Sequence, residues 1–323
     1  MSTRLALACS ALAAVVLAAT AGDQSSDHPA LTAAQRGPAT VERPAAALPP
    51  RQAPTASDCN PRASLRPKSP LPEPGQMPAG STMARIAERG HLIVGVGRDT
   101  YGFTFRDENL RPAGFDVDIA RDIAGAILGD RERVVFREVE RVVEAVRSGQ
   151  VDLTVAATTI TCKRREQVDF STVYYEAGQR VLVNRDSAIT SLDNLRGKRV
   201  CAARGTTSLT TILAAPSKPI PVGAASGTNC LMLLQLDEVD AISTDDTLLA
   251  GMAAQDPQTK IVGPRFTEEP YGIAINKDTP ELVRFVNAVL ERRAQDGRWR
   301  ASYQRWLMLL GPPPSPPTPQ YRD

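Results

Sequence analysis

Short apolar runs alternate with segments of helical period through the middle of the chain. The run Leu92–Val96 is apolar apart from one glycine and predicts a buried strand, and Val134–Phe136 and Asp152–Val155 predict two more. Between Phe115 and Ile127 a large apolar residue recurs at every fourth position, as on one face of a helix. Strands that alternate with helices favour an α/β architecture with a largely parallel sheet.

A second set of strand and helix patterns follows from residue 198. Its strands are predicted at Lys198–Ala202 and Ala241–Ser243, and its helices at Thr207–Leu213, Cys230–Leu236 and Thr247–Ala254. Val181–Val183 is predicted to leave the first set, and Gly272–Ile275 to return to it. Two longer helical patterns, Pro280–Gln295 and Trp299–Leu310, close the folded part, which is expected over about residues 81–311.

Both ends of the chain differ from this folded part. Arg4 precedes the apolar run Leu5–Ala19 and the small residues around Ala21, so residues 1–21 are predicted to be a signal peptide, with an uncleaved anchor as the alternative. Cys9 lies too early in the apolar run to carry a lipid at the cleavage site, so a lipid anchor is not expected. Residues 22–80 are rich in Pro, Ala, Ser and Thr, and 312–323 in Pro, which predicts a linker and a tail without a core.

Composition narrows the possible functions. The chain is 42% apolar and 23% charged with a net charge of +2, and its basic residues are spread out, which gives no support for a nucleic-acid partner. It has two histidines, no C-x-x-C and no G-x-S-x-G, so we expect no metal, no cofactor and no catalytic activity. Four cysteines follow the signal peptide, and an even number in an exported chain favours two disulfides, with three possible pairings: Cys59, Cys162, Cys201 and Cys230.

One motif and four landmarks carry a family resemblance. Gly114–Ile119, followed by Ile123, Ala124 and Ile127, resembles the signature of the extracellular solute-binding proteins of family 3, the substrate-binding proteins of amino-acid ABC transporters. The landmarks follow in the family's order: Thr159–Thr161 with Arg164 and Val168–Ser171; Arg204–Thr207; Asp240–Ala241 with Asp245; and Asp296–Gly297 with Trp306–Leu307. The resemblance covers about residues 83–311 and is closest to actinobacterial glutamate/glutamine-binding proteins.

The resemblance implies the type II periplasmic-binding-protein fold, with two lobes joined by two crossover strands and a ligand in the cleft between them. Lobe 1 would comprise residues 81–184 and 276–311, and lobe 2 residues 185–275. Cys201 and Cys230 then fall in one lobe and are the preferred pair, which leaves Cys59 with Cys162.

The same resemblance assigns residues to the two charges of a free amino acid. Arg164 would bind the carboxylate through its planar guanidinium, unless it is only a solvated member of the basic run Lys163–Arg165. Asp245 would bind the ammonium group, whereas Asp246 can simply cap the next helix. Donors would come from Thr159 and from Gly205, Thr206 and Thr207 at a helix start.

The ligand's side chain is harder to assign. A buried carboxylate would need a second cation, for which Arg98 is the first candidate and Arg204 and Arg180 follow. Phe103, or Tyr101 nearby, would cover the aliphatic part of the ligand, while Tyr174 and Tyr175 are expected near the hinge. These arginines favour glutamate or aspartate, and glutamine and asparagine stay open.

The expected function is therefore binding without catalysis. A monomer at the outer face of the cytoplasmic membrane or in the cell envelope would close its hinge on an amino acid and deliver it to the permease of an ABC importer. A sensor that signals to a membrane receptor needs the same clamp and is the main alternative. An enzyme on the same fold is the other, and no catalytic residues support it.

Overall fold

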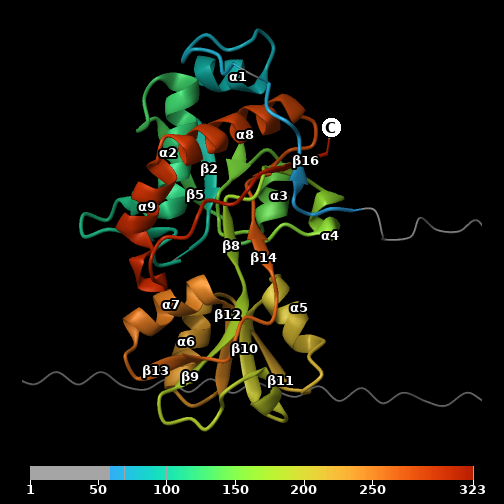
Figure 1. Cartoon of the computed structure of the whole chain (residues 1–323), viewed down its shortest axis with the longest axis vertical. Helices are drawn as coiled ribbons and strands as arrows, with labels where there is room; N and C mark the ends of the chain where they lie inside the picture. The colour runs from blue at the N-terminus through green and yellow to red at the C-terminus, as the bar shows by residue number, and fades with distance from the viewer. Residues whose placement is uncertain (1–58, 69, 99, 323) are drawn as a thin grey trace, which may run out of the picture. The chain divides into compact units, whose positions relative to one another are not determined.

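The computed structural model describes residues 59–68, 70–98 and 100–322. The predicted signal peptide lies outside these residues. Within them, no helix is long and apolar enough to cross a membrane. Figure 1 shows two lobes, each built on its own sheet, with β8 and β14 running between them.

The sheet of lobe 1 has five strands in the order β5-β2-β6-β15-β7. Their bounds are Val134–Glu138, Leu92–Val96, Leu153–Thr154, Ala274–Ile275 and Asp169–Phe170. β2 is parallel to β5 and β6, whereas β15 is antiparallel to both of its neighbours. The helices of this lobe are α1 (Thr82–Arg89), α2 (Phe115–Leu128), α3 (Val142–Arg147), α4 (Cys162–Arg165), α8 (Pro280–Gln295) and α9 (Arg298–Trp306).

Helix α2 shows how the sequence pattern builds this lobe. It follows Gly114, whose φ of 126° suits glycine, and a Cβ at that position would lie 2.2 Å from the carbonyl oxygen of Phe103. Its apolar face is buried in the main core against α8 and α9. The buried Asp122 on the same helix binds Arg293, Arg298 and Arg131, so charge pairing ties α2 to the C-terminal helices.

The sheet of lobe 2 also has five strands, in the order β11-β10-β12-β9-β13. Their bounds are Ile220–Ala224, Arg199–Ala203, Ala241–Asp245, Gln179–Asn184 and Thr259–Val262. Helices α5 (Thr207–Leu213), α6 (Gly227–Gln235) and α7 (Asp246–Gln255) pack against it. A disulfide between Cys201 in β10 and Cys230 in α6 confirms the preferred pairing in this lobe.

Two antiparallel strands connect the lobes. β8 (Tyr175–Ala177) carries the chain from lobe 1 to lobe 2, and β14 (Glu269–Tyr271) brings it back. The predicted lobe boundary needs correction at β9, because the predicted lobe 1 segment, residues 81–184, includes this strand. It pairs with β12 and β13 and so belongs to the sheet of lobe 2, while β15 already belongs to lobe 1.

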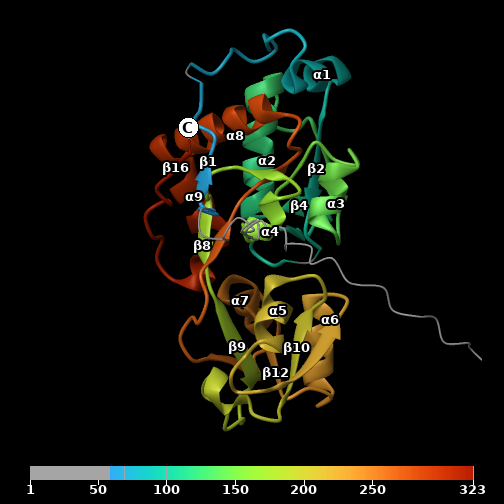
Figure 2. The same ribbon diagram turned by 90° about the vertical axis from the view of Figure 1, so that its right-hand side faces the viewer.

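The linker and tail predictions also need correction where the structure describes these segments. β1 (Ala63–Ser64) pairs in parallel with β16 (Gln320–Tyr321), so the first and last strands of the described residues lie side by side on lobe 1 (Figure 2). The Cys59–Cys162 disulfide, as predicted, adds a covalent link. Residues 59–64 have no apolar period of their own, but strand pairing and a disulfide hold them on lobe 1. The pattern of apolar residues does not predict either contact.

Candidate functional site

A cavity of about 820 Å³ lies between the lobes and is lined by residues of both. Lobe 1 contributes the loop after β6, with Thr159, and also Arg164 from α4. Lobe 2 contributes the segment from Arg204 to Ser208 before and within α5, and Asp245 at the end of β12. The walls thus lie at the carboxyl ends of strands, where open α/β sheets bind their ligands.

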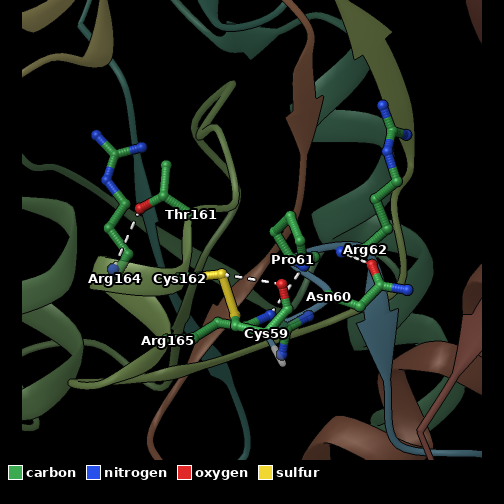
Figure 3. Close-up of a disulfide and its surroundings, with 8 residues drawn as sticks. All are labelled: Cys59, Asn60, Pro61, Arg62, Thr161, Cys162, Arg164 and Arg165. Atoms are coloured by element: carbon green, nitrogen blue, oxygen red, sulfur yellow. Dashed lines mark hydrogen bonds between the residues drawn. A yellow bond between two sulfur atoms is a disulfide. The ribbon is translucent and has the colours of Figure 1, made fainter. Parts of the chain in front are cut away.

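Arg164 is presented to the cavity by a single-turn helix. Thr161 caps α4, and its hydroxyl accepts a hydrogen bond from the Arg164 backbone N–H at 3.2 Å (Figure 3). The guanidinium donates from Nη1 to the carbonyl oxygen of Thr159 at 2.6 Å, which fixes its direction. Burial lowers the pKa of Arg164, and the nearby carboxylates of Glu269 and Asp245 oppose that effect. The group stays charged and can bind a carboxylate with its remaining donors.

Asp245 lies across the cavity, where β12 ends and α7 begins. Its Oδ2 accepts a hydrogen bond from the Tyr271 hydroxyl at 2.6 Å, while Oδ1 is buried and has no hydrogen-bond partner among the described residues. Burial, and then the charge of Glu269, raise the pKa of Asp245 to about 7. A buried carboxylate oxygen without a donor is a suitable partner for an ammonium group.

The start of α5 forms the rest of the lobe 2 wall. Gly205 has a φ of 77°, which turns the chain into the helix, and Thr206 is the N-cap that accepts from the Leu209 N–H at 3.2 Å. The Thr206 hydroxyl donates to the carbonyl oxygen of Ala203. The side chain of Arg204 is exposed in the cavity wall and makes no ion pair or hydrogen bond with the described residues.

Glu269 is a functional candidate that the sequence analysis missed. It lies buried on β14 and accepts hydrogen bonds from Thr159 of lobe 1 at 2.5 Å and from Thr207 of lobe 2 at 3.1 Å. Thr267 donates to its other oxygen at 2.8 Å. One carboxylate on a crossover strand therefore joins hydroxyl groups from both walls of the cavity. The sequence gives no reason to choose Glu269 over its exposed neighbour Glu268. A strand of three residues is too short for its sequence to show which side chains are buried.

Two predicted ligand contacts need correction. Phe103 is 0% exposed, and its ring packs edge-to-face against those of Phe115, Tyr175 and Tyr271 in the core of lobe 1. It does not line the cavity, because its backbone is held at the start of α2, where the Asp116 N–H donates to the Phe103 carbonyl oxygen. Arg98 is also absent from the cavity wall: its side chain is 54% exposed and pairs with Glu138.

The remaining predicted side chains lie elsewhere. Arg180 donates to the carbonyl oxygen of Gly263 at 2.7 Å, outside the cavity wall. Tyr101 is exposed and contacts the ring of Phe105. Tyr175 is part of the crossover strand β8, and Tyr174, just before it, donates to Asp116 at 2.9 Å. The structure thus gathers Arg164, Asp245, Thr159 and the segment Arg204–Thr207 in one cavity and leaves the other candidates outside it.

This geometry is that of a two-lobed binding protein, and a family comparison agrees with it. Residues 92–308, more than half of the chain, match the model of the bacterial extracellular solute-binding proteins, family 3. The chain belongs to this family, as the sequence resemblance predicted. It is a solute-binding protein and not an enzyme.

Individual proteins and structures support the same assignment. The ABC transporter glutamine-binding protein GlnH of Bacillus subtilis is 36% identical over 230 residues, which cover 70% of this chain and 84% of that protein. The glutamate-binding protein GluB of Corynebacterium efficiens is 30% identical over 252 residues, or 72% of this chain and 83% of GluB. A structure of an ancestral arginine-binding protein bound to glutamine superposes with a TM-score of 0.64 at 35% identity, covering 68% of this chain and 98% of that one. The two-lobe periplasmic-binding-protein fold is thereby confirmed.

Proposed function

We propose that this protein captures free glutamine, and glutamate less tightly, outside the cytoplasmic membrane and delivers it to the permease of an ABC importer. The observation that carries the proposal is the pairing of opposite charges across one cavity. Arg164 faces it from lobe 1, and Asp245 faces it from lobe 2 with a buried oxygen that lacks a donor among the described residues. Similarity to the glutamine-binding GlnH and the glutamate-binding GluB supports an amino acid of this size as the ligand.

Binding would proceed by closure of the lobes. The ligand carboxylate first meets Arg164, whose direction is already fixed by Thr159. The ammonium group then meets Asp245 when lobe 2 approaches. Contacts made to both lobes at once exist only in the closed form, so the ligand shifts the population towards it. The closed form is the one a permease would recognise.

The charges of the cavity wall favour an amide at the end of the ligand's side chain. A desolvated second carboxylate would need a buried cation. Among the described arginines of the wall, Arg141, Arg147 and Arg204 are exposed, and Arg141 is paired with Glu144 at 2.6 Å. Arg98, the first candidate for this role, is held by Glu138 outside the wall. Arg147, which donates to Gln167 at 3.3 Å, and Arg204 remain, and both are exposed, so glutamine, which brings no second charge, is the preferred ligand.

Isothermal titration calorimetry of the mature chain with glutamine, glutamate, asparagine and aspartate tests the proposal. We expect glutamine to bind most tightly and glutamate to follow. Arg204→Ala should weaken glutamate binding several-fold and leave glutamine unchanged, because only the acid brings a charge for Arg204 to bind. If none of the four amino acids binds, the proposed function is wrong.

A further inference from the structure

The segment before the first helix is fastened to lobe 1 along its length. This segment, residues 59–65, is called the N-terminal strap below. Its Cys59 is disulfide-bonded to Cys162 in α4, and its strand β1 pairs with β16 (Figure 3 shows the disulfide). The Ser64 hydroxyl donates to the carbonyl oxygen of Phe170 in β7 at 2.6 Å, and Asn287 of α8 donates to Ser64 and to the carbonyl oxygen of Leu65. The strap is therefore part of lobe 1.

From this fixed position, one side chain reaches both crossover strands. The Nη1 atom of Arg62 pairs with Glu176 in β8, and its Nη2 atom pairs with Glu268, the residue before β14, at 2.9 Å. The Arg62 side chain is only 24% exposed, so the guanidinium is largely shielded from water. A single cation thus joins the two connections on which any movement of the lobes depends.

The two acceptors differ in their relation to the hinge. Glu176 lies within the β8–β14 pair, opposite Pro270. Glu268 lies at the end of that pair from which the chain arrives out of lobe 2, because β14 follows β13 of that lobe. A rotation of lobe 2 towards lobe 1 would displace Glu268 relative to the strap more than Glu176, because Glu268 lies at the lobe 2 end of the pair. The Arg62–Glu268 pair is then specific to one arrangement of the lobes.

The size of the cavity indicates an open arrangement of the lobes. The cavity of about 820 Å³ is much larger than one amino acid, so the walls would have to approach each other to contact a ligand on both sides. We propose that Arg62 is a positioning residue for ligand binding, which holds the crossover strands in the open arrangement through Glu268 and gives up this contact on closure. This proposal rests on the proposed function only in that closure is what binds the ligand.

The effect of this contact on ligand affinity depends on the populations of the open and closed forms. The apparent dissociation constant equals the intrinsic one divided by the fraction of molecules that can close, so a contact found only in the open form weakens binding. Ion pairs with an exposed partner are weak, and the side chain of Glu268 is 84% exposed. Loss of the pair should therefore lower the apparent dissociation constant by about two- to fivefold.

The test is single-molecule energy transfer between dyes on the two lobes of the mature chain without amino acid. Exposed dye positions are provided by Arg133→Cys and Leu213→Cys, because the native cysteines of both lobes are disulfide-bonded. Arg62→Ala and Glu268→Gln are compared with Arg322→Ala. The control removes a lobe 1 pair with Asp169, next to β16, that does not touch the crossover strands.

We expect both Arg62→Ala and Glu268→Gln to increase the population with short inter-lobe distances, and Arg322→Ala to match the wild type. Unchanged distances in Glu268→Gln, a substitution at an exposed position that leaves the core intact, would overturn the proposal. An equal shift in Arg322→Ala would also overturn it, because the effect would then come from loosening the strap. Since this readout uses no ligand, it decides the proposal even if no amino acid binds.

Discussion

At the scale of single residues, the cavity combines one cation that is already oriented with one anion that is incompletely paired. Arg164 is held by the carbonyl oxygen of Thr159, so little side-chain freedom remains to be lost when a carboxylate binds. Asp245 keeps one buried oxygen without a donor in the described part of the chain, which costs free energy until an ammonium group arrives. The two sites therefore favour binding for different physical reasons.

Substitution of Arg164 tests the first of these sites. Arg164→Ala should weaken ligand binding at least about 100-fold, because truncating one partner of a hydrogen-bonded charge pair costs roughly 3 kcal/mol or more. Calorimetry measures this loss. Lys163→Ala, in the same helix but exposed and outside the cavity wall, should bind as the wild type does. Equal losses in the two variants would show that the guanidinium of Arg164 has no special role.

The pH dependence of binding tests the second. Burial raises the pKa of Asp245 to about 7, so its carboxyl group is mostly neutral at pH 6 and mostly charged at pH 8. An ammonium group binds the charged form, and the affinity should fall about tenfold as the pH drops from 8 to 6. Calorimetry over this range should show the decrease in the wild type.

Asp245→Asn provides the control for this pH effect. It should bind weakly at every pH and lack the decrease between pH 8 and pH 6, because its amide does not titrate. A variant that keeps the full pH dependence would assign the titration to another group.

The sequence predicted Arg164 and Asp245 in the cavity wall, but it also predicted Phe103 and Arg98 there and did not predict a role for Glu269. Arg164 and Asp245 belong to short motifs whose order is distinctive, so the resemblance was enough to place them. Phe103 follows the first strand as expected, yet its ring turns into the core because Phe115 and Tyr271 offer apolar contacts there. Glu269 accepts hydrogen bonds from Thr159 and Thr207, which are far from it in the sequence, so only the folded structure shows that it links the two walls.

At the scale of elements, each lobe contains one disulfide that stabilises it. Cys201 and Cys230 are buried and join β10 to α6 inside lobe 2, with a sequence separation of 29. The double variant Cys201→Ala/Cys230→Ala should lose about 3–4 kcal/mol of unfolding free energy, since the bond restricts the unfolded chain. Chemical denaturation followed by circular dichroism measures the loss. A loss below about 1 kcal/mol would mean that packing alone holds α6 on the sheet.

The hydrophobic pattern predicts the bounds of some helices and strands and fails for others. The helix period from Phe115 to Ile127 marks α2 closely, because a long amphipathic helix repeats its signal several times. β9 was assigned to the wrong lobe, since an apolar strand does not indicate which sheet it joins. β1 and β16, of two residues each, have no pattern, and only pairing between distant parts of the chain forms them.

At the scale of the whole molecule, the proposed ligand binding and the proposed hinge movement involve the same two strands. β14 carries Glu269, which joins hydroxyl groups of both cavity walls, and it follows Glu268, which binds the strap through Arg62. Under these two proposals, contacts at the hinge would adjust the affinity without touching the ligand. The order of the family motifs predicted the two lobes and the cleft, whereas this link between strap and hinge came from the structure alone.

The most direct test of the account is a crystal structure of the mature chain with the amino acid that binds it best in calorimetry. We predict that the ligand carboxylate lies on the Arg164 guanidinium and its ammonium group within hydrogen-bond distance of Asp245 Oδ1, with the cavity closed around both. A complex in which the amino acid binds elsewhere, with Arg164 and Asp245 facing open solvent, would contradict the account.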